Sequence, residues 1–229
     1  LARECGGATI LAWMAVATIL ISSLIALKKD NLKARLAFST IGQLSYIVLG
    51  IAILSPLSTA GALYHLVAHA FMKITLFMCA GAIFVITHKK DISEMVGLGR
   101  RMPVTMSAFT IASLGIAGFP FFVGFVSKAN IIMGALKTGQ LLFGATLIVS
   151  AVLALTYLMP VVLITFKREP VNPEFNTYGE ASKTMLVPML ITATVSVILG
   201  VAPNFGLHLL DLAMSTGEAV FAHVGGVIC

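Results

Sequence analysis

Residues 60–87 read AGALYHLVAHAFMKITLFMCAGAIFVIT, and Lys73 is the only charged side chain in this stretch. A helix of about 20 apolar residues crosses the hydrocarbon core of a bilayer, so the stretch predicts a membrane-spanning helix. A membrane β-barrel would instead need alternating segments of about ten residues. The whole chain of 229 residues has the same character, with 59% apolar and 10% charged residues. This composition excludes a soluble enzyme, a disordered chain, a nucleic-acid binder and a disulfide-stapled secreted module.

Charge-free runs locate the other spans. The run 36–72 is too long for one crossing, and the turn signal SPLST at residues 55–59 divides it. We therefore predict an all-α integral membrane protein, a bundle of about six transmembrane helices with one broken. The predicted spans are 8–27, 36–54, 60–87, 104–136, 141–166 and 184–202. Residues 205–224 predict an interfacial helix along the outer surface. Because the chain starts at Leu1, a few residues before a span, we expect a fragment of a longer chain.

Basic residues gather in three of the predicted loops. The loops 28–35, 88–101 and 167–183 hold eleven of the 15 lysine and arginine residues, whereas the other side holds only Arg3 and Lys137. Loops rich in Lys and Arg face the cytoplasm, so we predict that these three loops are cytoplasmic in a multi-pass protein of the cell (inner) membrane. The net charge of +6 then reflects membrane topology, and no nucleic-acid partner is expected.

Three ionisable side chains share one face of the helix 60–87. His65, His69 and Lys73 follow i, i+4, i+8 and fall within an arc of about 80°. Lys73 is roughly 20 Å from either helix end, too far to reach an interface. No predicted span holds an acidic partner, and an ionised lysine at the bilayer centre costs at least about 2.5–3.5 kcal/mol. Since imidazole titrates near neutral pH and burial favours a neutral amine, the face predicts a proton relay.

Two other interpretations of this face remain open. Its polar groups could simply join neighbouring helices by hydrogen bonds. Alternatively, His65 and His69 could bind haem or a metal in a membrane anchor, because neutral imidazole is a common ligand. That rival needs further ligands, and no other predicted span has a histidine at mid-depth. The three cysteines, Cys5, Cys79 and Cys229, have no metal-ligand spacing. A Soret band in the absorption spectrum would favour the rival.

The segment 104–136 predicts a broken helix. As one continuous helix it would be about 50 Å long, which exceeds a membrane of about 30 Å. Gly118, Pro120 and Gly124 cluster in its middle, and proline removes a backbone donor. Discontinuous helices mark ion sites in transporters, so Lys128 on the second half is a candidate site residue. The alternative is an interfacial lysine that ends an ordinary, shorter span.

The span 36–54 contributes a weaker signal. Ser39, Gln43 and Tyr46 follow i, i+4, i+7 and share a face, which predicts a polar surface that supports the ionisable residues. The sequence holds no phosphate loop, nucleophile elbow or redox motif. We therefore identify no catalytic site, cofactor or metal site in the chain, and whether it belongs to an enzyme stays open.

Three motifs occur in order along the chain and resemble one family. Residues 32–46, LKARLAFSTIGQLSY, resemble a K-R-x-L-A-Y-S-S/T-x-x-Q-x-G-Y stretch. Residues 65–73, HLVAHAFMK, are similar to an H-x-x-x-H-A-x-x-K helix, and residues 118–128, GFPFFVGFVSK, to a G-x-P…G-F-x-S-K break. These are motifs of the antiporter-like subunits shared by respiratory complex I, membrane-bound hydrogenases and Mrp-type Na+/H+ antiporters. The chain departs from them at Phe38, where tyrosine is usual, and at Ser45, where glycine is usual.

The resemblance implies a fold of about fourteen helices with two inverted five-helix repeats. Residues 1–166 look like the second repeat, and residues 167–229 like a loop, an additional transmembrane helix and an amphipathic tail. The first repeat, with its glutamate and lysine, is then missing here. The implied function is proton translocation between Lys73 with its two histidines and Lys128. The driving event is either electron transfer, in a complex I-type NADH-quinone oxidoreductase or hydrogenase, or exchange with Na+. The implied partners are other membrane subunits, protons, Na+ in an antiporter, and the lipid bilayer.

Overall fold

The computed structural model describes residues 6–167, 169, 170 and 172–225. The expectations for Arg3, Cys5, Arg168 and Cys229 lie outside the described residues. Within the described residues the elements are helices joined by short connections, which confirms the all-α class. The α-helices are α1 (Gly7–Lys28), α2 (Leu32–Ala52), α3 (Pro56–Thr87), α4 (Leu98–Arg101), α5 (Pro103–Ala117), α6 (Val123–Lys137), α7 (Leu141–Lys167), α8 (Lys183–Val201) and α9 (Leu209–Gly225). Two 3₁₀-helices are η1 (Ile92–Glu94) and η2 (Pro173–Asn176).

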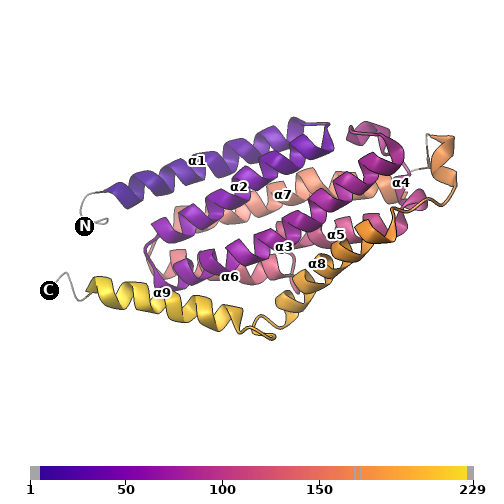
Figure 1. Ribbon diagram of the computed structural model, residues 1–229. Helices are drawn as coiled ribbons and strands as arrows, with labels where there is room; N and C mark the ends of the chain where they lie inside the picture. Colours follow the sequence, from indigo (N-terminus) through magenta and orange to yellow (C-terminus); the bar gives the residue numbers. More distant parts are fainter. Residues whose placement is uncertain (1–5, 168, 171, 226–229) are drawn as a thin grey trace.

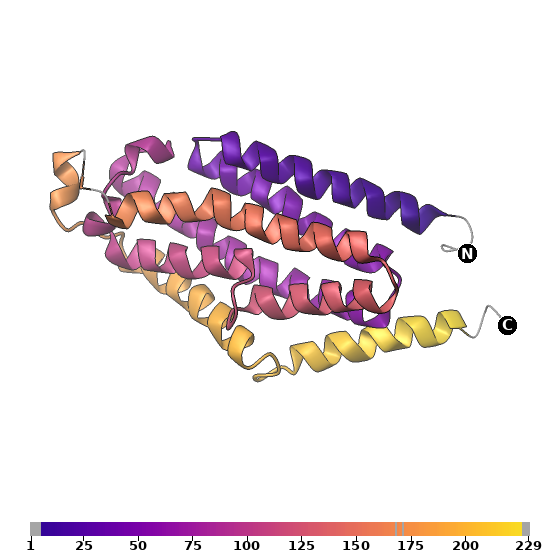
Figure 2. The same cartoon turned by 180° about the vertical axis from the view of Figure 1, so that it is seen from behind.

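Five helices are long and apolar enough to cross a membrane: α1, α2, α3, α7 and α8. Helices α5 and α6 have 15 residues each, about 22 Å, and are too short to cross alone. They follow one another along the bundle, so together they make one further crossing (Figures 1 and 2). The predicted bundle of about six transmembrane helices, one of them broken, is therefore confirmed.

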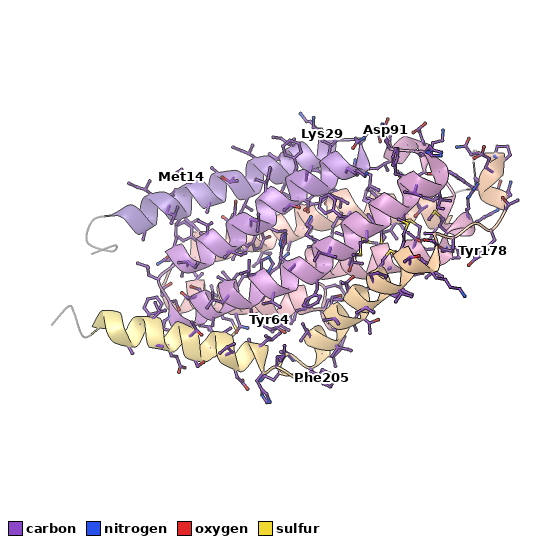
Figure 3. The ribbon with its side chains drawn as sticks, viewed as in Figure 1. Met14, Lys29, Tyr64, Asp91, Tyr178 and Phe205 are labelled. Atoms are coloured by element: carbon purple, nitrogen blue, oxygen red, sulfur yellow. The ribbon has the colours of Figure 1, made fainter. Side chains whose placement is uncertain are left out.

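The three basic loops lie at one end of the bundle. Figure 3 shows Lys29 and Asp91 at the end where Tyr178 also lies. Loops 28–35 and 88–101 are tied together, because Asp30 accepts hydrogen bonds from the backbone N–H and the hydroxyl of Ser93 at 3.2 and 2.6 Å. Asn31 donates to Asp91 in the same way at 3.3 Å. The predicted grouping of these loops on one side agrees with this arrangement.

Helix α3 occupies the centre of the bundle and contacts α2, α5, α6, α8 and α9. Small residues let α6 approach it closely. A Cβ at Gly61 would lie 2.8 Å from the backbone nitrogen of Ile131, and one at Gly134 would lie 2.5 Å from the backbone nitrogen of Ser58. These glycines bring the helix of His65 and Lys73 directly against the helix that carries Lys128.

Helices α8 and α9 both pack against α3, one after the other along its length. The end of α8 packs on the connection between α5 and α6, where a Cβ at Gly200 would collide with the backbone of Phe121 and Phe122. Tyr64 donates to the carbonyl of Leu199 at 2.8 Å. After the turn near Phe205, α9 continues toward the end of the bundle where α3 begins (Figures 1 and 3). It packs along the start of α3, with Gly217 against the carbonyl of Pro56. The tail expected at residues 205–224 is thus a helix with one face packed on the bundle.

Candidate functional site

The break between α5 and α6 exposes backbone groups inside the bundle. Helix α5 ends at Ala117, Gly118 adopts the left-handed conformation with φ 84°, and α6 begins at Val123. Phe121 is also left-handed, with φ 72°. Gly124, expected within the break, lies in the first turn of α6, where an added Cβ would collide with the carbonyl oxygen of Gly115. The chain therefore turns tightly here and leaves carbonyls of α5 without helical partners.

Lys128 fills the space at this break. Its side chain is 4% exposed, and its Nζ donates a hydrogen bond to the carbonyl of Ile116. The Nζ also lies 4.9 Å from the centroid of the Tyr46 ring. The stem of Lys128 runs past Gly118, where a Cβ would lie 3.1 Å from its Cδ. The structure thus buries Lys128 among helices, unlike the interfacial lysine of the alternative interpretation.

The two histidines lie on α3, and His65 is the one next to the α6 segment that carries Lys128. His65 is fully buried, and its Nδ1 lies 2.8 Å from the hydroxyl of Ser127, the residue before Lys128. The ring centroids of His65 and His69 are 6.2 Å apart. Among the described residues, the Nε2 atoms of both histidines have no hydrogen-bond partner. Buried polar nitrogens normally have partners, so each Nε2 atom is a place where a bridging water can bind.

Lys73 lies one further turn along the same face. It is 4% exposed, and its Nζ donates to the hydroxyl of Ser39 at 2.7 Å and to the carbonyl of Leu36 at 3.2 Å. The Ser39 hydroxyl in turn lies 2.8 Å from the hydroxyl of Tyr157 on α7. Lys73 is therefore held by neutral oxygens from α2, and its hydrogen-bonded chain extends to α7.

The polar face of α2 meets these ionisable groups. Ser39, Gln43 and Tyr46 are each at most 1% exposed. The Tyr46 hydroxyl donates to the carbonyl of Leu147 at 3.2 Å, and its ring stacks on His65 with centroids 5.5 Å apart. The Gln43 Oε1 has no hydrogen-bond partner in the described part of the chain. The site therefore gathers residues from α2, α3, α6 and α7.

No carboxylate of the described residues pairs with either of the two buried lysines. Across the residues that the structure describes, the ion pairs are Lys89–Glu94, Arg101–Glu174 and His208–Asp211, all outside the site. The same residues contain no group of three or more His, Cys, Asp or Glu side chains that could hold a metal. The arrangement is thus two amines and two imidazoles among neutral hydrogen-bonding groups, which suits proton exchange better than metal ligation.

Sequence reasoning missed several residues of this site. Ser127 directly precedes Lys128 within the motif at 118–128, and that position was its only signal. Tyr157 was visible only as one of several hydroxyl residues in the charge-free span 141–166. The Ile116 carbonyl is a backbone group with no residue-type signal at all.

The family comparison identifies the fold. Residues 7–156 match the model of a transmembrane family described as NADH:quinone oxidoreductase/Mrp antiporter. The chain belongs to this family. As a member of the NADH:quinone oxidoreductase/Mrp antiporter family, it is a multi-pass membrane subunit, and the resemblance drawn from its three motifs is confirmed.

Relatives and solved structures agree with this membership. The chain is 36% identical over 202 residues to NADH-quinone oxidoreductase subunit N of Desulforudis audaxviator, an alignment that covers 83% of this chain and 40% of that protein. In the structure of the Mrp complex from Dietzia sp. DQ12-45-1b, a subunit matches 97% of this chain over 49% of its own length, with 23% identity and a TM-score of 0.85. Respiratory complex I from Thermus thermophilus matches 93% of this chain over 45% of one of its chains, with 22% identity and a TM-score of 0.82.

These matches show how much of each relative's length the chain covers. It spans about 40% of the length of that curated relative and about half of the matched subunit structures. The two structural matches are below 25% identity and therefore establish the fold alone. Both come from multisubunit membrane complexes.

Proposed function

We propose that this chain is the proton-translocating part of an antiporter-like subunit, and that protons move between Lys73, His69, His65 and Lys128. In this proposal residues 1–166 form the second five-helix repeat, and residues 167–229 add a loop, a transmembrane helix and an amphipathic tail. Loops 28–35, 88–101 and 167–183 face the cytoplasm from an inner membrane. Other membrane subunits couple transport either to electron transfer or to exchange with Na+.

The observation that carries this proposal is the burial of two amines with no carboxylate of the described residues in contact. Lys73 and Lys128 are each 4% exposed, and every polar contact they make is with a neutral oxygen or a ring. A permanently charged lysine in this setting is costly. A lysine that gives up its proton for part of a cycle avoids that cost, because its neutral form still donates hydrogen bonds.

The two histidines connect the lysines in the proposed route. A proton leaving Lys73 passes to the Nε2 side of His69 and then to His65, with bridging water where the rings do not touch. His65 lies beside Ser127, so the proton arrives next to Lys128 at the helix break. Freed backbone at the break can hold water at membrane depth, which opens the route to the outer side. A charge on one site disfavours a proton on the next, and this repulsion couples the steps.

The experiment compares two lysines of one helix. Lys128 is buried at the start of α6, whereas Lys137 ends the same helix and is exposed. The full-length subunit in its assembled complex is reconstituted into vesicles, and proton uptake is followed with a pH-sensitive dye. Lys128→Met should abolish uptake, and Lys137→Met should leave it within about twofold of wild type, because an exposed charge at a helix end contributes little. Uptake by an assembled Lys128→Met complex at the wild-type rate would overturn the proposal.

A further inference from the structure

We infer that Tyr46 is a positioning residue for Lys128, and that it acts through the π face of its ring, which holds the protonated amine at the helix break. This inference rests on the proposed function. It adds that the Tyr46 ring binds Lys128 more strongly when the amine is charged than when it is neutral. The phenolic hydroxyl has a separate role, which is to fix the ring.

The ring of Tyr46 is held from several sides. The residue is fully buried on α2, and its hydroxyl donates to the carbonyl of Leu147 on α7 at 3.2 Å. The ring stacks on His65 of α3 with an angle of 21° between the planes. Its place on α2, the hydrogen bond to α7 and the stacking on α3 together determine where the π face points. The Lys128 Nζ lies over this face, 4.9 Å from the centroid.

The two partners of the Lys128 amine respond differently to its charge. The Ile116 carbonyl accepts a hydrogen bond from either the charged or the neutral amine. An aromatic face attracts a cation through its quadrupole, and this attraction is strongest where water is excluded. It disappears when the amine is neutral. The carbonyl binds the charged amine more strongly than the neutral one, and the Tyr46 ring adds a second contact that favours the protonated lysine, in a place where no described carboxylate does so.

The same ring links Lys128 to the imidazole next to it. The ionisable groups near the amine are His65, which stacks on Tyr46, and His69 beyond it. Each imidazole is neutral when only one of its ring nitrogens carries a proton. A second proton on His65 makes the ring cationic, and this charge would repel a charged Lys128 amine. By attracting the charged lysine, the ring favours transfer from His65 to Lys128. Weakening the π face should therefore slow transport without removing any residue of the relay.

The test changes the electron density of the ring and keeps its shape. Tyr46→Phe removes only the hydroxyl and keeps the π face, so it serves as the reference for the series. Position 46 then receives phenylalanine with one, two or three fluorine atoms, which withdraw electron density stepwise. Proton uptake by the full-length subunit in its complex should fall with each fluorine, to about tenfold below the Tyr46→Phe level for three, in line with a desolvated cation–π contact. Equal uptake across the fluorine series would overturn the inference.

Two controls separate this effect from packing and from the proposed function. The same fluorinated residues at Phe109, which is fully buried on α5 with no cation of the described residues over its ring, should leave uptake unchanged. Fluorination at position 46 should lower the unfolding midpoint when Lys128 is present and not in a Lys128→Met background. An equal decrease in both backgrounds would assign the effect to packing and overturn the inference.

The Lys128→Met variant separates failure of the inference from failure of the proposed function. If Lys128→Met itself leaves uptake intact, the proposed relay fails. If uptake is equal across the fluorine series and the Lys128→Met complex is inactive, only the role of Tyr46 is rejected.

Discussion

Lys128 and Ile116 lie on opposite sides of the break between α5 and α6, and the Lys128 amine donates a hydrogen bond to the Ile116 carbonyl. In an α-helix the donor for this carbonyl would be the N–H of residue 120, but Pro120 has none. Pro120 and the break thus leave the carbonyl free, so the chain creates the partner that its own buried lysine needs. The glycines and proline near residue 120 therefore do more than shorten a long helix, because they supply an oxygen at membrane depth without adding a charge.

The close packing at this break predicts a strong effect of one methyl group. Gly124→Ala places a Cβ against the Gly115 carbonyl oxygen, and overpacking of this kind costs about 1–3 kcal/mol. The unfolding midpoint of the full-length subunit in detergent should fall accordingly. The matched control is Gly81→Ala in the second half of α3, where a Cβ would meet nothing within 4 Å. This change should be neutral or stabilise by up to about 1 kcal/mol. Equal midpoints for the two variants would contradict the tight turn.

Glu180 anchors the loop before α8 to the start of α5. Its carboxylate accepts hydrogen bonds from the backbone N–H groups of Val104 and Thr105 and from the Thr105 hydroxyl. Glu180→Ala should therefore destabilise the subunit by about 0.5–2 kcal/mol, as loss of a helix N-terminal cap does. Thermal unfolding measures this loss. Glu218→Ala, at an exposed position of α9, should change the midpoint little, and a comparable loss there would argue against the anchor.

The orientation of the bundle can be tested with two single cysteines. Ser93 in η1 and Lys137 at the end of α6 are both exposed. The segment before α4, which includes η1, and the end of α6 lie at opposite ends of the bundle (Figure 1). Cys79 is buried, so Cys5 and Cys229 are replaced by serine as background. A membrane-impermeant maleimide added outside should label Lys137→Cys and leave Ser93→Cys unlabelled until the membrane is permeabilised. The reverse pattern would invert the proposed topology. Ser58, in the first turn of α3, is fully buried and is a poor reporter.

Sequence periodicity predicted the spans and the shared face of His65, His69 and Lys73, because these depend on positions within one helix. It also predicted the break, because the segment was too long for a bilayer and held proline among glycines. It did not predict which groups meet across helices. His65 with Ser127 and Ser39 with Tyr157 are separated by 62 and 118 residues, and single positions carry no signal for such pairs. Glu180 was missed for the same reason, because the loop around it has a solvated composition and only the folded chain brings it to α5.

The central claim is that Lys73 must release its proton during transport. Its amine is buried at mid-helix and held by Ser39 and Leu36, with no described carboxylate in contact. Lys73→Ala removes the proton carrier, and Lys73→Arg replaces it with a group that stays charged. The most direct measurement is proton uptake by vesicles that contain the assembled complex, made with wild-type, Lys73→Ala or Lys73→Arg subunit at equal protein content. The account predicts that both variants assemble and that neither transports protons. Uptake near the wild-type rate in either assembled variant would contradict it.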